Sequence, residues 1–206
     1  MLGFTLANGR PPQLAAGQPF NTLLLLLFYG VSGWIARGRL RATGLHVFHR
    51  LRKRDILFIA LGFAALIAGH VLTGLQLVLT HQTGHVQAGF EHFSVAERTP
   101  LLTDLSIATT AATLILLAPV VEETIFRGLL FGALVRPLGV FFGALVSAVL
   151  FGAVHLDLVL FSTFVVLGFV NALAYAATEN LTVPVILHAI NNTFATAFLI
   201  AHAASA

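Results

Sequence analysis

Long apolar runs alternate with short polar stretches along most of the chain. A run of about 20 apolar residues has the length that an α-helix needs to cross a bilayer. The pattern predicts helices at about 20–36, 55–79, 104–135, 138–155, 158–177 and 182–202. We therefore expect an all-α polytopic membrane helical bundle with about six transmembrane helices. The stretch 104–135 is longer than one span needs, so it should be tilted, broken or re-entrant.

Two polar segments with helix-breaking residues divide the C-terminal half. They are "RPLG" at 136–139 and "TENLTVP" at 178–184, and both contain the Pro or Gly that ends helices. The sequence before residue 101 is organised differently. We expect residues 1–100 to form a lead-in and two transmembrane helices joined by a basic loop, and residues 101–206 to form one helical core.

The composition supports a membrane protein. Hydrophobic residues make up 58% of the 206 residues and charged residues only 9%, whereas an ordinary soluble domain is about 25% charged. The chain has no cysteine. Disulfides, thiolate metal sites and a cysteine nucleophile are therefore excluded.

The positive charge gathers in one loop. Seven of the eleven basic residues lie there: Arg37, Arg39, Arg41, Arg50, Arg52, Lys53 and Arg54. Basic loops next to transmembrane helices stay in the cytoplasm. We therefore expect a multi-pass protein of the plasma (inner) membrane, with the loop 37–54 cytoplasmic and the lipid bilayer as its partner. A charge confined to this loop does not indicate nucleic-acid binding.

Three charged residues interrupt an apolar run in the segment "VVEETIFRG". A charge at the bilayer centre costs roughly 2.5–3.5 kcal/mol, so each of these charges needs a partner inside the protein. Glu123 and Arg127 are four residues apart and can pair on one helix face. Glu122 is rotated about 100° from Glu123, so we expect its partner to come from another helix.

Two later segments supply polar groups at helical spacing. Phe151 and His155 are four residues apart, and so are His188 and Asn192. Each residue alone has an ordinary structural explanation: the histidines and asparagines, including Asn171, can join helices by hydrogen bonds. Taken together, they favour one shared polar site. Five other histidines, at helix ends or in the polar loop, are given no role: His70, His81, His85, His92 and His202.

These motifs resemble the CPBP family of intramembrane proteases, which includes the type II CAAX prenyl endopeptidases and the abortive-infection proteins. The pattern E-E-x-x-x-R reads Glu122 to Arg127 here, F-x-x-x-H reads Phe151 to His155, and H-x-x-x-N reads His188 to Asn192. The resemblance covers roughly residues 100–202. The first hundred residues have no match in it.

The resemblance implies an intramembrane endopeptidase that hydrolyses a peptide bond in a membrane-associated protein or peptide. Glu122 would activate water as general base and then act as acid, a role that suits a carboxylate in an apolar site. His155 would help to hold the water. His188 and Asn192 would donate hydrogen bonds to the oxyanion.

Supporting roles and the metal question follow from the same resemblance. Glu123 and Arg127 would fix the direction of Glu122, and Phe151 would pack beside them. We expect no metal, because H-E-x-x-H is absent. The alternative is Zn²⁺ held by Glu122, His155 and His188.

Other functions remain open at this point. A catalytically inactive membrane scaffold or bacteriocin-immunity-type protein would keep the fold without using Glu122. A proton-coupled transporter would use the same polar groups as a relay, but the internal repeats of transporters are not visible in the sequence. A rhomboid-like serine protease would use Ser32 of "GVSG", a short motif that many chains contain.

Overall fold

The computed structural model describes residues 48–83, 85, 108–109 and 111–205, with side chains placed up to residue 198. All regular structure in this part of the chain is helical. The predicted helix 20–36, most of the basic loop, Ser32 and the segment 86–107 lie outside the described residues.

The described residues form the following helices, in chain order. They are α2 (Lys53–Leu79), η2 (Thr113–Leu117), α4 (Ala118–Glu123), η3 (Thr124–Phe131), α5 (Gly132–Val154), α6 (Phe161–Thr178) and α7 (Thr182–Ser205), of which η2 and η3 are π-helical. Three stretches are long and apolar enough to span a membrane: Lys53–Leu79, Thr113–Val154 and Phe161–Thr178. The predicted class, an all-helical membrane protein, is confirmed.

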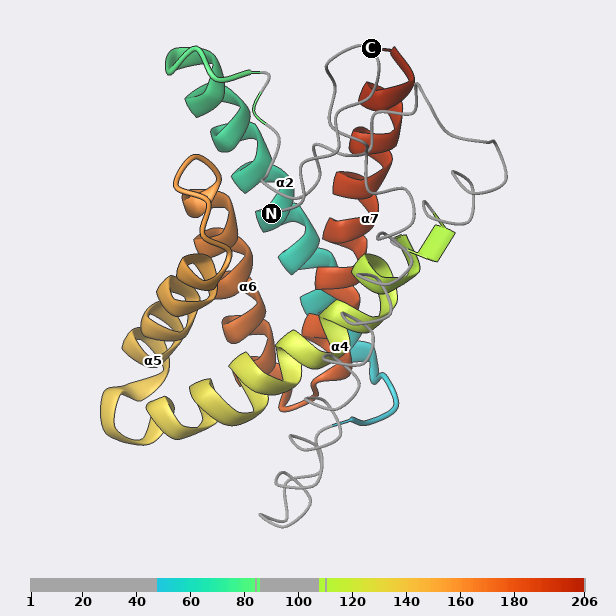
Figure 1. Cartoon of the computed structure of the whole chain (residues 1–206). Coiled ribbons are helices and arrows are strands. Elements are labelled where there is room, and N and C mark those ends of the chain that lie inside the picture. Colours follow the sequence, from blue (N-terminus) through green and yellow to red (C-terminus); the bar gives the residue numbers. More distant parts are fainter. Residues whose placement is uncertain (1–47, 84, 86–107, 110, 206) are drawn as a thin grey trace, which may run out of the picture.

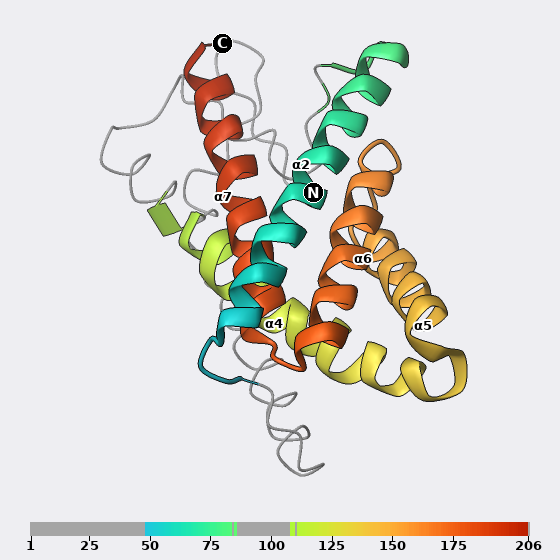
Figure 2. The same ribbon diagram turned by 180° about the vertical axis from the view of Figure 1, so that it is seen from behind.

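The stretch Thr113–Val154 is bent at one glycine. Gly139 has φ 74° and ψ 175°, a conformation outside the helical region, and Pro137 precedes it. A left-handed φ of this size strains any residue with a Cβ, so glycine is required here. The break falls in the predicted "RPLG" segment. Before it, η2, α4 and η3 cross obliquely over the other helices, as both Figure 1 and Figure 2 show, and this is the tilt that was predicted.

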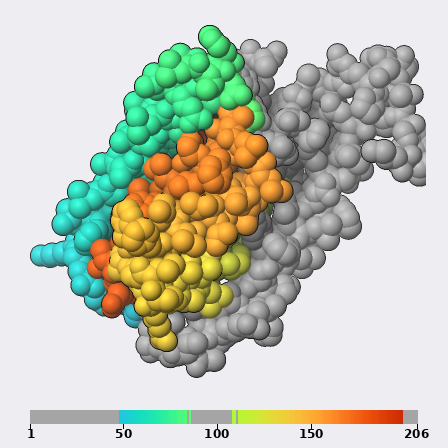
Figure 3. All heavy atoms as spheres, turned by 90° about the vertical axis from the view of Figure 1, so that its left-hand side faces the viewer, coloured from blue at the N-terminus to red at the C-terminus, as the bar shows by residue number. Residues whose placement is uncertain are grey.

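Small residues bring the helices into close contact. α5 packs mainly on α6, and α2 packs on α6 and α7. A Cβ added to Gly168 would lie 2.9 Å from the Cα of Ala148, so α6 and α5 touch through their backbones. Figure 3 shows α2, α6 and α5 as one continuous surface. Large apolar side chains such as Leu57, Phe141 and Leu150 are exposed on this bundle, as expected for surfaces that face lipid.

A polar cluster joins the start of α2 to the α6–α7 turn, and we call it the Asp55 cluster. The buried Asp55 carboxylate accepts hydrogen bonds from the backbone N–H of Arg52 at 3.0 Å and from Asn180 Nδ2 at 3.1 Å. Asn180 Oδ1 in turn accepts from the backbone N–H groups of His49 and Thr182. These bonds cap α2 and α7 at the same time. The sequence analysis did not identify this cluster.

A second cluster joins the other end of α2 to the α5–α6 loop. His85 Nε2 lies 2.9 Å from Asp157 Oδ2, and Asp157 Oδ1 accepts from the backbone N–H groups of Val159 and Leu160. Burial works to raise the pKa of Asp157, but the hydrogen bonds from His85 and from the two backbone N–H groups outweigh it. The pKa of Asp157 therefore lies below its usual value.

Candidate active site

Glu123 is the centre of the polar site in the bundle. Its side chain is 0% exposed, and its Oε1 accepts from Asn171 Nδ2 at 2.9 Å. His188 Nδ1 lies 2.7 Å from the same oxygen, and Arg127 Nε lies 2.9 Å from Oε2. The predicted pair of Glu123 and Arg127 is thus present. The two further partners come from α6 and α7, so this carboxylate ties three helical segments together.

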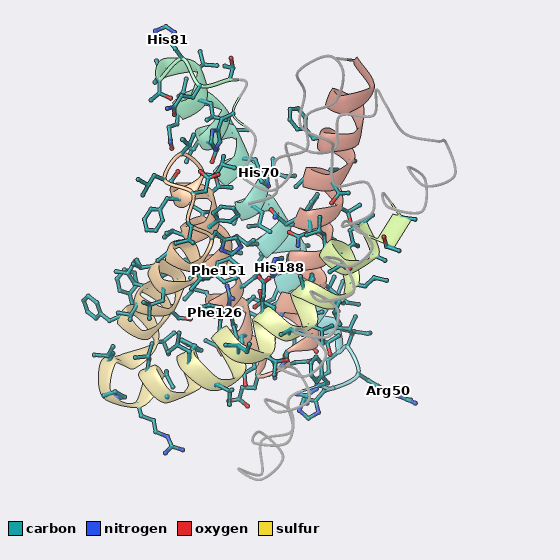
Figure 4. The ribbon with its side chains drawn as sticks, viewed as in Figure 1. Arg50, His70, His81, Phe126, Phe151 and His188 are labelled. Carbon is teal, nitrogen blue, oxygen red and sulfur yellow. The ribbon has the colours of Figure 1, made fainter. Side chains whose placement is uncertain are left out.

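Arg127 is enclosed as completely as its partner. Its contact with Glu123 is an ion pair whose angle lies outside the hydrogen-bond range, and its Nη2 donates to the carbonyl of Gly168 at 3.0 Å. The guanidinium carbon also lies 4.6 Å from the centre of the Phe151 ring. Phe151 therefore contributes a cation–π contact besides the packing that was predicted. Its ring also meets Phe126 edge to face (Figure 4).

His188 stands between the two glutamates. Its Nδ1 is bonded to Glu123 and its Nε2 lies 3.9 Å from Glu122 Oε2. The His188 side chain is 3% exposed, whereas that of Glu122 is 16% exposed. The predicted partner of Glu122 from another helix is therefore near it. Of the two carboxylates, Glu122 is the one with access to its surroundings.

His155 lies at the C-terminal end of α5, close to the same group. Its Nδ1 is 2.7 Å from the carbonyl oxygen of Phe151, and its ring stacks on Phe164 with 4.0 Å between the centroids. It is also electrostatically coupled to Glu122 and His188. The carbonyl and the aromatic ring together fix the direction of the imidazole.

Asn192 is held by the irregular helix η2. In the π-helical pattern of i→i+5 bonds, Ala118 N–H donates to Thr113 O. The next donor would be residue 119, which is a proline without N–H, so the carbonyl of Leu114 lacks a helical donor. Asn192 Nδ2 supplies one at 2.8 Å. One of the two amide hydrogens of Asn192 is used in this bond, and the other has no hydrogen-bond acceptor among the described residues.

The structure thus brings Glu122, Glu123 and Phe151 close to His188. Asn192 follows His188 by one turn of α7, and the predicted catalytic roles stay predictions. Two residues of the network were not foreseen. Asn171 was interpreted only as a residue that joins helices, and His70 was given no role, yet its Nε2 lies 2.8 Å from Asn191 Oδ1. Nothing in the local sequence marks either contact, because their partners are 48 and 121 residues away.

The fold and this site define an all-helical integral membrane protein with a buried polar cluster between its helices. Residues 104–194 match the family described as type II CAAX prenyl endopeptidase Rce1-like. The resemblance that the sequence motifs predicted is therefore confirmed over this segment, which holds Glu122, His155, His188 and Asn192.

Two bacterial proteins are similar to the same part of the chain. "Putative membrane peptidase YdiL" of Bacillus subtilis (strain 168) is 42% identical over 79 residues, which are 38% of this chain and 32% of that protein. "Membrane-embedded CAAX protease MroQ" of Staphylococcus aureus (strain USA300) is 30% identical over 89 residues, 40% of this chain and 36% of that protein. The matches thus span about a third of the length of each relative. No solved structure matches the chain at a comparable level of significance.

Proposed function

We propose that this protein is an intramembrane endopeptidase in which Glu122 activates the attacking water. The observation that carries the proposal is the position of His188, whose Nδ1 is held by the buried Glu123 while its Nε2 faces the more accessible Glu122. A carboxylate beside an imidazole held in one direction is the arrangement that general acid–base catalysis needs. The similarity to proteins named as peptidases supports the same conclusion.

The hydrogen-bond partners define how each imidazole is protonated. The carboxylate of Glu123 and the carbonyl of Phe151 can only accept, so His188 and His155 each carry a proton on Nδ1. A neutral His155 then offers the lone pair of Nε2 to a water molecule. This fits the water-holding role that the family resemblance implies.

The charges explain how His188 acts as a donor. Glu122, Glu123 and Arg127 together carry two negative charges and one positive charge. The proposed reaction uses His188 with a proton on both ring nitrogens, so that the four side chains together carry no net charge. His188 then presents an N–H on the side of Glu122, beside the free hydrogen of Asn192.

The reaction follows from these assignments. Glu122 takes a proton from water, and the water oxygen forms a bond to the carbonyl carbon of the substrate peptide. The carbonyl oxygen becomes an oxyanion that accepts from His188 Nε2–H and Asn192 Nδ2–H. The C–N bond then breaks, and Glu122 returns the proton to the leaving amine. A carboxylic acid and an amine are released, and each side chain of the enzyme returns to its starting protonation state.

We propose that this chemistry needs no metal. Two ligands of a tetrahedral zinc, each about 2.0–2.2 Å from it, lie about 3.4 Å apart. Glu122 Oε2 and His188 Nε2 are 3.9 Å apart, which is longer than this separation, and the chain has no H-E-x-x-H segment. Activity that survives dialysis against a zinc chelator, in protein free of zinc by elemental analysis, is expected. Activity lost on dialysis and restored by zinc would favour the alternative Zn²⁺ site.

The substrate is a membrane-associated protein or peptide, because a site inside a lipid-facing bundle is reached from the membrane. The protein would reside in the plasma membrane with the loop 37–54 on the cytoplasmic side. No base-specific or phosphate-binding arrangement is implied by this site.

The test compares the full chain with its Glu122→Gln variant in detergent. Each is incubated with a bacterial membrane-protein extract in water enriched in ¹⁸O, and new peptide ends are identified by mass spectrometry. We expect new ends with ¹⁸O in the carboxyl group for the natural sequence, and a loss of about a hundredfold or more in Glu122→Gln. Equal sets of ends from both proteins would overturn the proposal and favour the inactive scaffold.

A further inference from the structure

Four groups form a hydrogen-bonded chain from α2 across α7 to η2, and we call it the His70 chain. His70 Nε2 is 2.8 Å from Asn191 Oδ1, Asn191 Nδ2 donates to Asn192 Oδ1 at 3.3 Å, and Asn192 Nδ2 donates to Leu114 O at 2.8 Å. His70 itself belongs to α2, outside the segment that matches the family.

The direction of every bond in the His70 chain follows from its last member. A carbonyl such as that of Leu114 can only accept, so Asn192 must turn its Nδ2 toward it and its Oδ1 toward Asn191. Asn191 must then present Nδ2 to Asn192 and Oδ1 to His70. His70 must therefore donate from Nε2. His70 holds the other end of the same amide by the shorter of its two bonds, 2.8 Å against 3.3 Å to Asn192, so without His70 the Asn191 side chain would keep only the longer bond.

The surroundings make this chain effective. His70 lies on α2, which is long and apolar enough to span a membrane, and lipid offers no substitute for a lost hydrogen bond. α2 packs on α7 about two turns before His70: a Cβ on Gly62 would come 2.6 Å from Leu187, and Phe63 stacks on Phe194. These contacts hold α2, which carries His70 (labelled in Figure 4), against α7.

We propose that His70 is a positioning residue of the protease site: it fixes Asn191, and through it aims the free N–H of Asn192 at the oxyanion. This inference rests on the proposed function. Small errors in the direction of a catalytic group are costly, because the donor must point to where the charge develops. His70 acts through Asn191 and Asn192 and does not touch the substrate.

The first test measures turnover of one cleavage site found in the membrane-protein extract. For His70→Ala we expect kcat to fall about tenfold with KM unchanged. His70→Gln should retain most of the kcat, because its Nε2 can donate to Asn191. Asn191→Ala should lose as much as His70→Ala, and the double variant no more than either. His81→Ala, at the exposed end beyond α2, is the matched control and should match the natural sequence.

The second test does not depend on activity. In the full chain with ¹⁵N-labelled histidine in bilayers, we expect the His70 signal to show a protonated Nε2, and Asn191→Ala to shift this signal while leaving that of His188 in place. Full kcat in a folded His70→Ala, or a proton on Nδ1 alone, would overturn the role of His70. If the role of His70 is overturned while Glu122→Gln is inactive in the same assay, the proposed function still holds. If Glu122→Gln is fully active, the proposed function fails first.

Discussion

Two carboxylates among the described residues have no exposed surface, Glu123 in the middle of the bundle and Asp55 in the first turn of α2. Glu123 is held by side chains from its own helix, from α6 and from α7. Asp55 is held by a backbone N–H and by the amide of Asn180, and its nearby Arg54 is 3.6 Å away and half exposed. The first carboxylate directs an imidazole, whereas the second closes a turn. Complete burial alone therefore does not distinguish a carboxylate that orients a residue of the candidate site from one that stabilises a turn. The hydrogen-bond partners of the carboxylate distinguish them.

Removing Glu123 should have the largest effect. Glu123→Ala leaves Arg127 buried without its counter-charge, which we expect to cost about 3–5 kcal/mol of the free energy of unfolding. It also releases His188, so activity should disappear. Thermal melting in detergent and the peptide-end assay measure the two losses. Glu123→Ala combined with Arg127→Met should regain much of the stability but none of the activity; a stable, active single variant would contradict this account.

Glycine substitutions test the packing on which Arg127 depends. In Gly168→Ala the new Cβ would lie 2.9 Å from Ala148 Cα, and the carbonyl that binds Arg127 would shift. We expect a loss of about 1–3 kcal/mol, seen as a lower melting temperature. Gly74→Ala is the matched control, because its Cβ meets nothing within 4 Å, and it should be neutral or stabilising by up to about 1 kcal/mol. Equal melting temperatures would show that α5 and α6 are not in close contact.

The Asp55 cluster should respond differently from the Glu123 network. Asp55→Asn keeps the shape of the side chain, and its amide oxygen can take the place of Oδ2, which accepts from both Arg52 N–H and Asn180 Nδ2. Both bonds are weakened because the acceptor is no longer charged. We expect a loss of about 1 kcal/mol with kcat unchanged. Melting and turnover measured on one preparation test both parts. A loss of activity larger than the loss of folded protein would place Asp55 with Glu123 rather than apart from it.

The smallest effect is expected at Asp157, which is held like Asp55. Its folded-state pKa lies below the unfolded value of about 4. The stabilisation is therefore complete above the unfolded pKa and is lost as the pH falls through the folded pKa. As the pH is lowered below about 4, the melting temperature of Asp157→Asn should fall less than that of the natural sequence. The corresponding difference in the free energy of unfolding should be under about 1 kcal/mol. Parallel pH profiles would contradict the low pKa.

Helical periodicity predicted most of the fold but not its irregular parts. The expected helices 55–79, 158–177 and 182–202 correspond closely to α2, α6 and α7, because long apolar runs and Pro or Gly breakers are local signals. The π-helices η2 and η3 leave no such signal. Their i→i+5 bonds depend on neighbours such as Asn192, which satisfies a carbonyl that Pro119 cannot.

The sequence predicted which residues belong to the candidate site better than it predicted the hydrogen bonds between them. The spacing of Glu123 and Arg127 indicated their ion pair, and the need of Glu122 for a partner indicated a histidine from another helix. The bonds of Glu123 to His188 and Asn171, and of His70 to Asn191, join residues 48 to 121 positions apart. A single sequence carries no record of such pairings. The same holds for Asp55 and Asn180, 125 positions apart.

The π-helical turn at Thr113–Leu117 makes this part of the gene sensitive to length. A π-turn is an α-helical turn that has accommodated one additional residue. Loss of a single codon there would leave a regular helix with an unremarkable composition. It would nevertheless rotate what precedes the turn by about 100° relative to Glu122 and Glu123, and it would withdraw the carbonyl that anchors Asn192. Descendants of this protein should therefore tolerate exchange of residues in this segment far better than a change in their number.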